Sequence, residues 1–387
     1  MTTPLPSADP SLRRVLVRGV NWLGDAVMTT PALQRLREAL PEAHITLLTH
    51  EKLAALWQHH PSLNAIITFS SRESPWSVAR RLRAENFQSA LVLPNSPRSA
   101  MEVWLARVPQ RIGYARPWRT WMLTQPVAPR PGQVRMSKRS VGEIKRLVRF
   151  SAGGPPPAAE YAPRDLAHQC HDYLHLAAAL GANPESLPPR LEVTEAEMRQ
   201  AEDAFVSYWR AQAQNTASGK PLVLLGMNPG AEYGPAKRWP AESFAAVTHE
   251  VSRRMPNCLW LTFGGLGDQA LCSDIAGLAC DRVINLAGKT SLRELMALLK
   301  LCRVLLTNDS GPMHVAAALG TPVVVPFGST SPELTGPGLP GDTRHQLLTS
   351  AAPCSPCFRR TCPIDFRCMT GIGTERVAEA VCRATGE

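Results

Sequence analysis

The stretch LLTNDSGPMH, residues 305–314, contains the end of an apolar strand, a polar turn with one glycine, and a helix start with proline in its first turn. A strand that passes through a short turn into a helix is the unit of a doubly wound parallel sheet. Backbone N–H groups at Ser310 and Gly311, with the dipole of the helix behind them, would hold a diphosphate. His314 would face that anion. The alternatives are a simple N-cap for Asp309 and Ser310, and a core or surface histidine for His314.

The same rhythm of strand and helix runs through both halves of the chain, and it predicts βαβ units in each half. In the first half we expect strands at 13–19, 43–50, 64–70 and 89–95, and helices at 26–40, 51–60, 76–84, 99–107, 137–150 and 165–180. In the second half we expect strands at 222–227, 258–263, 282–286, 303–307 and 321–326, and helices at 240–255, 268–280, 291–301 and 312–319.

The length of 387 residues suggests two or three domains. We place a boundary near the Pro188-Pro189 pair, which divides the chain into two α/β, Rossmann-like domains, 1–189 and 190–387. In such folds ligands bind beyond the carboxyl ends of the strands, and two facing domains would share one cleft. The C-terminal helix could pack back on the first domain.

The composition excludes several classes of protein. With 44% apolar and 19% charged residues, the chain can build full cores. It has no apolar run of membrane-spanning length and no visible secretory leader, so a cytoplasmic protein with reduced thiols is expected. The net charge of +10 is uneven: residues 1–190 carry 24 Lys+Arg and 13 Asp+Glu, a net of +11, whereas residues 191–387 carry 18 and 19, a net of −1.

A second turn of interest follows the first expected strand, with the sequence VNWLGD at residues 20–25. Gly24 permits a tight turn, and Asp25 falls at the start of a helix. Judged by the local residues alone, Asp25 is better explained as a helix cap than as a general base. The positive end of a helix keeps such a carboxylate ionised but makes it a weaker base.

Two loops of the second half add weak phosphate signals. The loop after residues 222–227 contains Asn228, Gly230 and Lys237, and its small residues would let backbone N–H groups approach an anion. It is not a Walker A loop, and an ordinary basic loop is the alternative. The glycine-rich turn at residues 263–268 ends in Asp268, which is also explained as a cap for the next helix.

Four cysteines near the end, Cys354, Cys357, Cys362 and Cys368, have the spacing C-x2-C-x4-C-x5-C. Four thiolates within fifteen residues could hold a structural zinc ion, although zinc knuckles usually separate two CxxC pairs by a longer stretch. The alternative is a packed loop with free thiols. The metal content is therefore left open.

The first half also carries a basic stretch with tryptophans nearby. Residues 130–149 hold seven Lys and Arg and one acid, Glu143, and Trp104, Trp118 and Trp121 lie among further arginines upstream. Such a run is usually a solvated face. It could also bind a polyanion, and the indoles could stack on sugars or bases, lie at a membrane interface or belong to the core.

Taken together, these segments resemble glycosyltransferase family 9, the ADP-heptose:lipopolysaccharide heptosyltransferases, and most closely the heptosyltransferase II branch. The residues that carry the resemblance are NWLGDAVMTTPAL (21–33), LPNSPRSA (93–100), RIGY (111–114), NPGAEYGPAKRWP (228–240), LAGKTSL (286–292), TNDSGPMHVAAALGTPVVVPFGSTSP (307–332) and the cysteine cluster. They span nearly the whole chain after residue 12. One departure is the absence of a histidine between Cys362 and Cys368, which weakens any metal role for that segment.

The resemblance implies a GT-B fold, with the acceptor on the N-terminal domain and the nucleotide sugar on the C-terminal one. It implies that Asp25 is the catalytic base, against the local preference for a cap. It places the donor at Lys237, Asp309, Ser310, Gly311 and His314, and the two glycine-containing loops add Asn228, Gly230 and Asp268 as candidate donor residues. From their position, Asn21 and Trp22 would line the acceptor path, and Asn95, Ser96 and Arg98 would bind its anionic groups.

The implied reaction is an inverting transfer of L-glycero-D-manno-heptose from ADP-heptose to the heptosylated Kdo-lipid A inner core of lipopolysaccharide. No cofactor would be required, because the sequence shows no DxD pair for a metal, and zinc would be structural at most. The expected partners are the nucleotide sugar, the anionic lipid-linked acceptor and the cytoplasmic face of the inner membrane, but no nucleic acid. The alternatives are a GT-B enzyme that uses another nucleotide sugar and a non-catalytic polyanion-binding protein.

Overall fold

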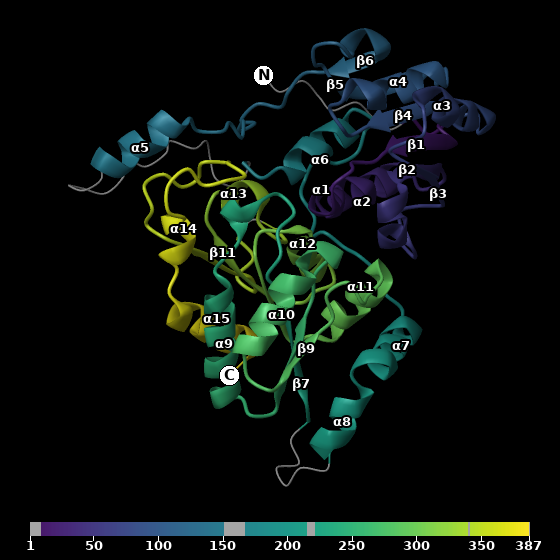
Figure 1. Ribbon diagram of the computed structural model, residues 1–387. Helices are drawn as coiled ribbons and strands as arrows, with labels where there is room; N and C mark the ends of the chain where they lie inside the picture. Colours follow the sequence, from purple (N-terminus) through teal and green to yellow (C-terminus); the bar gives the residue numbers. More distant parts are fainter. Residues whose placement is uncertain (1–8, 151–166, 215–220, 340, 387) are drawn as a thin grey trace. The chain divides into compact units, whose positions relative to one another are not determined.

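The computed structural model describes residues 9–150, 167–214, 221–339 and 341–386. The described residues form two compact units (Figure 1). The first unit comprises residues 9–133 and 167–192. The second comprises residues 134–150, 193–214, 221–339 and 341–386. Within the described residues, no helix is long and apolar enough to cross a bilayer.

The first unit is built on a six-stranded sheet in the order β3-β2-β1-β4-β5-β6, in which every neighbouring pair is parallel. Its strands are β1 (Arg14–Arg18), β2 (His44–His50), β3 (Ala65–Phe69), β4 (Ser89–Val92), β5 (Gln110–Tyr114) and β6 (Gln125–Val127). Its helices are α1 (Leu23–Met28), α2 (Thr30–Ala39), η1 (Glu51–Trp57), α3 (Pro75–Ala84), α4 (Pro97–Leu105), η2 (Thr120–Met122) and α6 (Cys170–Ala178).

Local sequence explains these elements. The apolar run Val15–Val17 is fully buried, as expected of a central parallel strand covered on both faces. Helices α3 and α4 each begin with a serine whose side chain caps the helix, Ser74 or Ser96, followed by proline in the first turn.

The second unit has a sheet in the order β12-β11-β10-β7-β8-β9, again with parallel pairs throughout. Its strands are β7 (Val223–Asn228), β8 (Cys258–Thr262), β9 (Val283–Asn285), β10 (Val304–Thr307), β11 (Val323–Phe327) and β12 (Gln346–Thr349). Its helices are α5 (Val141–Phe150), α7 (Glu195–Phe205), α8 (Ser207–Gln214), η5 (Pro235–Lys237), α9 (Ala241–Arg254), η6 (Leu266–Asp268), α10 (Gln269–Leu278), α11 (Leu292–Leu301), α12 (Gly311–Ala318), α13 (Pro332–Thr335), α14 (Arg367–Thr370) and α15 (Thr374–Thr385).

All the predicted strands are confirmed within a few residues at their ends. Three strands were not predicted, β5, β6 and β12. The helix expected at 26–40 is divided at Thr29 into α1 and α2, and the helix expected at 51–60 is the 3-10 helix η1. The helix expected at 165–180 is α6, and its first two expected residues lie outside the described chain.

The two units differ from the predicted halves in one segment. Residues 134–150 group with the second unit, although the proposed boundary near Pro189 puts them in the first domain. The reason is packing: Ile144 of α5 lies in a small apolar cluster with Cys354 and Cys357. In addition, the Arg139 amide donates to the carbonyl oxygen of Cys357 at 3.0 Å.

The C-terminal helix α15 packs inside the second unit, against α9 and the strands β10, β11 and β12. Val377, Ala378 and Val381 are fully buried in the core of that unit.

In each sheet the order in which successive strands are added reverses once. In doubly wound folds ligands bind at the point of this reversal. In the first unit the strand order reverses between the neighbours β1 and β4, and in the second between β7 and β10. At such a switch point the loops that leave the two strands diverge to opposite faces and open a crevice at the carboxyl edge. The turns after these four strands contain most of the predicted site residues.

Candidate active site

The turns after β7 and β10 are joined in the second unit. Asn228, the last residue of β7, lies opposite Thr307, the last residue of β10. The Asn228 side-chain amide donates to the Gly230 carbonyl oxygen and to Ser310 Oγ, both at 3.3 Å. Three of the predicted donor residues are therefore brought together by one buried amide.

The Asn308 side chain also connects the turns after β7 and β10. Its Nδ2 donates to the Pro229 carbonyl oxygen at 2.7 Å, and its Oδ1 accepts from the Trp239 amide at 3.0 Å. Asn308 is fully buried. The geometry of the crevice thus depends on a residue that the sequence analysis did not single out.

Lys237 and Asp309 form a close ion pair in this crevice. Lys237 Nζ lies 2.6 Å from Asp309 Oδ2, and the two side chains are 13% and 5% exposed. Thr330 Oγ1 donates to the same Oδ2 at 2.6 Å. A buried ion pair needs such extra hydrogen bonds to offset the cost of desolvation. Thr330 was not predicted, although it lies in the turn after β11, at the same edge of the sheet.

Helix α12 starts at the crevice between the turns after β7 and β10. Ser310 is its N-cap, with an extended backbone and without a side-chain capping bond. Its Oγ lies 3.3 Å from Thr307 Oγ1 as well as from Asn228, so the first-turn amides are not covered by this hydroxyl. Pro312 has no N–H to contribute. His314 lies one turn into the helix and is buried.

Gly230 makes a close approach to Asp268. A Cβ atom at Gly230 would lie 2.6 Å from Asp268 Oδ2, so no larger residue fits without movement. Asp268 Oδ2 also accepts from the Gly265 amide at 3.1 Å, and Oδ1 lies 3.8 Å from Arg238. Asp268 therefore stabilises the turn at Gly265, and it also lies against Gly230 in the predicted donor loop.

Tyr233 brings a second cation to this loop. Lys237 Nζ lies 4.7 Å from the centroid of the Tyr233 ring, and the Arg360 guanidinium carbon lies 5.3 Å from it. The Tyr233 hydroxyl donates to the Phe358 carbonyl oxygen at 2.7 Å, which ties the loop to the cysteine segment. Sequence reasoning missed Arg360 in this role because it lies about 120 residues from Lys237 along the chain.

In the first unit Asp25 is the third residue of α1, and the N-cap is Trp22. The local interpretation of Asp25 as the N-cap is therefore wrong, although an acidic residue in the first turn still favours the helix. Asp25 Oδ1 lies 3.5 Å from Gln169 Nε2, which also donates to the Tyr173 hydroxyl at 2.8 Å. Burial, and after it the Asp25 charge, raises the pKa of Tyr173 well above its usual value.

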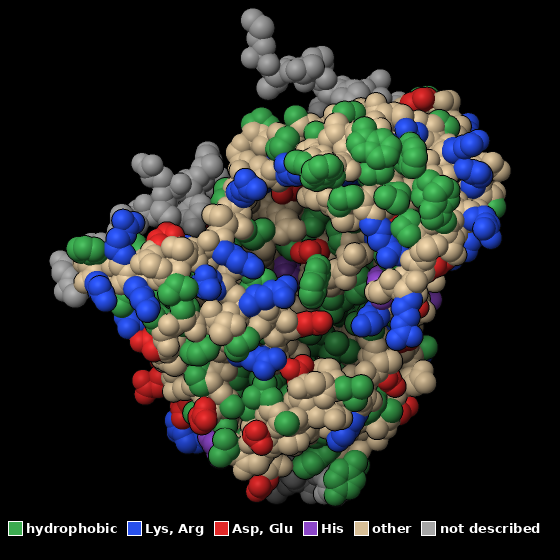
Figure 2. Space-filling model, turned by 45° about the horizontal axis from the view of Figure 1, so that its top comes forward, with side chains coloured by type: hydrophobic (Ala, Val, Ile, Leu, Met, Phe, Trp, Pro, Cys, Tyr) green, Lys and Arg blue, Asp and Glu red, His purple; other side chains and the backbone are tan. Residues whose placement is uncertain are grey.

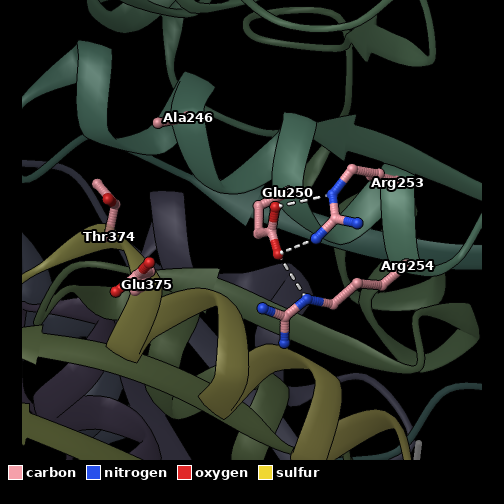
Figure 3. A pocket seen from close by; sticks show the side chains of 6 residues that line it. All are labelled: Ala246, Glu250, Arg253, Arg254, Thr374 and Glu375. Atoms are coloured by element: carbon pink, nitrogen blue, oxygen red, sulfur yellow. Dashed lines mark hydrogen bonds and ion pairs between the residues drawn. The ribbon is translucent and has the colours of Figure 1, made fainter.

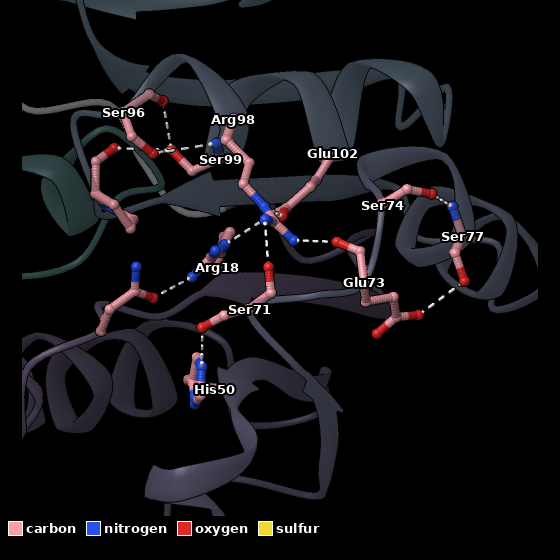
Figure 4. Close-up of polar contacts among 12 residues, drawn as sticks. Arg18, His50, Ser71, Glu73, Ser74, Ser77, Ser96, Arg98, Ser99 and Glu102 are labelled. Atoms are coloured by element: carbon pink, nitrogen blue, oxygen red, sulfur yellow. Dashed lines mark hydrogen bonds and ion pairs between the residues drawn. The ribbon is translucent and has the colours of Figure 1, made fainter.

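A buried charge network holds the turn that precedes α1 (Figure 4). Arg18 Nε donates to Glu102 Oε2 at 2.8 Å, and both side chains are almost fully buried. Arg18 Nη1 donates to Asn21 Oδ1 at 3.1 Å. Burial lowers the pKa of Arg18, and the Glu102 carboxylate opposes that shift. Asn21, a predicted acceptor residue, is thus positioned by a rigid ion pair, next to Trp22, which is half-exposed.

Arg98 joins the same network. Its Nε donates to Glu102 Oε1 at 3.0 Å, and its two terminal nitrogens donate to the carbonyl oxygens of Ser71 and Glu73 (Figure 4). A guanidinium has five N–H donors, so two remain for an anion. Three N–H donors of Arg98 are therefore used within the protein, and the predicted binding of acceptor anions is limited to the other two donors.

The turn after β4 presents Asn95 and Ser96 at the surface. Ser96 is the N-cap of α4, and its side chain accepts from the Ser99 amide at 3.3 Å. Below this turn lies Arg119, which is completely buried and donates through Nη1 to the Pro94 carbonyl oxygen. Nε and Nη2 of Arg119 have no hydrogen-bond partner. Burial lowers the pKa of Arg119 to about 10.

An unpaired buried guanidinium is costly. Arg119 lies at the carboxyl edge of the first sheet, beside the turn that was predicted to bind acceptor anions. The sequence showed Arg119 only as one of several arginines, and nothing in the pattern marks it as buried.

The four cysteines of the C-terminal segment lie partly or fully buried as thiols. Burial, and after it the neighbouring thiols, raises the pKa of Cys368 to about 12, and burial raises the pKa of Cys354 and Cys357. Among the described residues, which include Cys362, no three Cys, His, Asp or Glu side chains are placed to hold a metal ion.

A pocket of about 390 Å³ lies between α9 and α15 and is lined by Ala246, Glu250, Arg253, Arg254, Thr374 and Glu375 (Figure 3). Glu250 pairs with both arginines, at 2.8 and 2.6 Å, and these hydrogen bonds lower the pKa of Glu250 to about 2. The three charged residues of α9 lie in its last turns. Because α9 starts from the carboxyl edge of the sheet, this pocket lies toward the opposite edge and is not part of the candidate site.

Two doubly wound parallel sheets, each with a switch point at its carboxyl edge, are the architecture of the GT-B fold class. A model of glycosyltransferase family 9 (heptosyltransferase) matches residues 158–366, more than half of the chain. The chain belongs to this family. Its predicted fold class, family and transferase activity are therefore confirmed.

Relatives of known structure and name agree with this assignment. The chain is 30% identical to lipopolysaccharide heptosyltransferase 2 of Salmonella typhimurium over 84% of its length and 85% of the relative. It superimposes on ADP-heptose lps heptosyltransferase II of E. coli with a TM-score of 0.71 and 24% identity, covering 96% of this chain and 98% of that one. For a family 9 glycosyltransferase of Veillonella parvula the TM-score is 0.74 at 23% identity, covering 98% and 99%.

Proposed function

We propose that the chain transfers L-glycero-D-manno-heptose from ADP-heptose to the heptosylated Kdo-lipid A inner core of lipopolysaccharide, with inversion at the anomeric carbon. The observation that carries the proposal is the Lys237–Asp309 pair, with 2.6 Å between Nζ and Oδ2, placed where β7, β10 and the start of α12 meet. A cation beside the amides of a helix start suits a diphosphate. The names of the relatives supply the sugar and the acceptor.

On the donor side, the bond between the anomeric carbon and the ADP oxygen breaks, and negative charge grows on that oxygen. Lys237 and the first amides of α12 receive this charge. Asp309 neutralises Lys237 and fixes the position of its ammonium group, so that little reorganisation is needed when the charge develops. His314 and the Asn228 amide border the same place.

On the acceptor side, Asp25 takes the proton of the acceptor hydroxyl as that oxygen bonds to an oxocarbenium-like sugar. Gln169 limits the rotation of the carboxylate, since its amide lies 3.5 Å from Oδ1. Asn21 and Trp22 line the approach, while Asn95 and the two remaining donors of Arg98 bind the carboxylates and phosphates of the acceptor.

The acceptor is lipid-linked, so we also propose that the enzyme works at the cytoplasmic face of the inner membrane. No metal is assigned to the reaction or to the cysteine segment.

The test is an ADP-release assay with ADP-heptose and a panel of truncated core acceptors. Release that requires the heptosylated acceptor supports the proposal, whereas equal or greater release from UDP-sugars would assign another donor. Asp25→Asn should remove turnover and leave ADP-heptose affinity nearly unchanged; normal turnover in this variant would exclude Asp25 as the base. Nucleotide-sugar-independent binding of polyanions, without any turnover, would instead favour a binding protein.

A further inference from the structure

Three tryptophans of the first unit present their indoles to solvent on neighbouring segments. Trp104 in α4 is 38% exposed, Trp118 in the turn after β5 is 84% exposed, and Trp121 in η2 is 65% exposed. The rings of Trp104 and Trp121 meet edge to face, with centroids 5.1 Å apart. Green apolar side chains gather on the surface of the first unit at the top of Figure 2, with blue Lys and Arg side chains at their margin. We call Trp104, Trp118 and Trp121 the indole patch.

The segments that carry the patch are well packed on their inner side. Met122 and Val103 are buried in the core of the first unit, next in sequence to Trp121 and Trp104. Arg119, next to Trp118, is completely buried. The indoles are therefore exposed because their neighbours fix these segments, and not because the segments lack a core to join.

The backbone at Trp118 is held in an unfavourable conformation. Its φ is +66°, in the left-handed region that bulky side chains avoid. The turn is closed by Thr120 Oγ1, which donates to the Arg116 carbonyl oxygen at 2.9 Å and accepts from the Arg116 amide at 3.1 Å. Strain of this kind persists only where the surrounding structure imposes it, and it is concentrated at functional sites. Here it presents a tryptophan to water.

The chain segment that carries the patch is basic. Residues 103–133, all in the first unit, contain five arginines and no Lys, Asp or Glu. Arg107, Arg111 and Arg116 are at least partly exposed, whereas Arg119 and Arg130 are buried. Arg83 reaches the end of α4, where its Nη2 donates to the Leu105 carbonyl oxygen at 2.8 Å, and the exposed Arg107 follows in the next turn. A ligand for this surface therefore combines an apolar layer with negative charge.

We propose that the indole patch, bordered by Arg83 and Arg107, is a docking surface for a bilayer with anionic headgroups. Tryptophan favours the boundary between headgroups and acyl chains, because its ring is apolar and its N–H can still bond to a polar atom. Arginines beside it pair with headgroup phosphates. The proposal deepens the proposed function, and rests on it only for the idea that the acceptor is lipid-linked.

The test is co-sedimentation of the full chain with vesicles of phosphatidylcholine and phosphatidylglycerol, and with vesicles of phosphatidylcholine alone. The wild type should bind the anionic vesicles. Trp118→Ser with Trp121→Ser should abolish most of that binding. Arg83→Gln and Arg107→Gln should each weaken it about fivefold on anionic vesicles only.

The matched control is Trp76→Ser. Trp76 is a tryptophan of the same unit, 69% exposed, that lies outside the patch. The Trp76→Ser variant should bind vesicles like the wild type. Wild-type binding by the double tryptophan variant, or an equal loss in Trp76→Ser, would overturn the proposal. Loss of RNA binding or of self-association in the double variant, without vesicle binding by the wild type, would also overturn it and assign the patch to that partner.

The unfolding temperature of each variant and its ADP release with a truncated, water-soluble acceptor should match the wild type, because the patch contains no proposed site residue. These readouts separate the two proposals. The protein could bind vesicles, lose that binding in the double tryptophan variant, and yet release no ADP from ADP-heptose. That result would support the docking surface and refute the transferase function.

Discussion

Lys237 and Asp309 depend on each other, and this dependence can be separated from donor binding. In Lys237→Met the Asp309 carboxylate, which is almost fully buried, would keep the hydrogen bond from Thr330 but lose its cation. An uncompensated buried charge costs about 3 kcal/mol or more. We therefore expect a lower unfolding temperature together with weaker ADP-heptose binding, measured by thermal unfolding and by calorimetric titration.

Lys237→Met combined with Asp309→Asn removes both charges, and it should restore much of the lost unfolding temperature. It should not restore donor affinity, because the cation that meets the diphosphate is still missing. Each such charge-assisted contact is worth about tenfold in the dissociation constant. Wild-type affinity in the double variant would show that Lys237 acts on stability alone.

Arg119 is expected to show the opposite pattern. Its guanidinium is fully buried, with two nitrogens that lack hydrogen-bond partners, so Arg119→Met removes a desolvated charge and keeps most of the volume. The unfolding temperature should stay the same or rise. The KM for an anionic core acceptor should stay within about twofold of the wild-type value, because no nitrogen of this buried guanidinium is exposed to a ligand. A KM that rises about tenfold would instead show that the acceptor reaches Arg119.

At the scale of single elements, helix α7 depends on one carboxylate. Glu197 completes the capping box with Thr194 and also pairs with Arg293 of α11 at 2.6 Å. The Arg293 hydrogen bonds lower the pKa of Glu197 to about 2. A depressed carboxylate pKa contributes stability that is complete above the unfolded value near 4.5 and is lost as the pH falls toward 2.

We therefore expect Glu197→Gln to lower the free energy of unfolding by about 2 kcal/mol at neutral pH, which is less than the full shift would give because water reaches the pair. The difference from the wild type should shrink between pH 4.5 and pH 2. Denaturant titrations at several pH values would measure it. Glu195→Gln, on the same helix, is the control and should have little effect, because Glu195 makes only an exposed pair with Arg199.

The elements differ in how far the sequence could predict them. Strands β7 and β10 were predictable, because apolar runs end in turns rich in Gly, Pro and Asn. Strand β6 has three residues, one of which is proline, and only its pairing with β5 at the edge of the sheet makes it a strand. The site shows the same limit. Local patterns located the turns, whereas the joint held by Asn308 and the burial of Arg119 depend on contacts between residues far apart in the chain.

For the whole molecule, the structure changes the account of the charge. The sequence put the excess of +11 in residues 1–190 and none in the remainder. Residues 134–150 carry six Lys and Arg and one Glu, a net of +5, and they group with the second unit. Nearly half of the basic excess therefore belongs to the unit that contains the proposed donor site. Three of these cations, Lys145, Arg146 and Arg149, are exposed on α5.

Because the acceptor carries several anionic groups, its KM should rise with ionic strength, while the KM for ADP-heptose changes less. Neutralising α5 with Lys145→Gln, Arg146→Gln and Arg149→Gln should reduce this salt dependence and leave the donor KM unchanged. The control is Arg253→Gln with Arg254→Gln, since Glu250 already neutralises part of that charge. Initial rates at low and high salt give both constants. An acceptor KM that does not change with salt, or the same loss of salt dependence in the control, would contradict a role for α5 in attracting the acceptor.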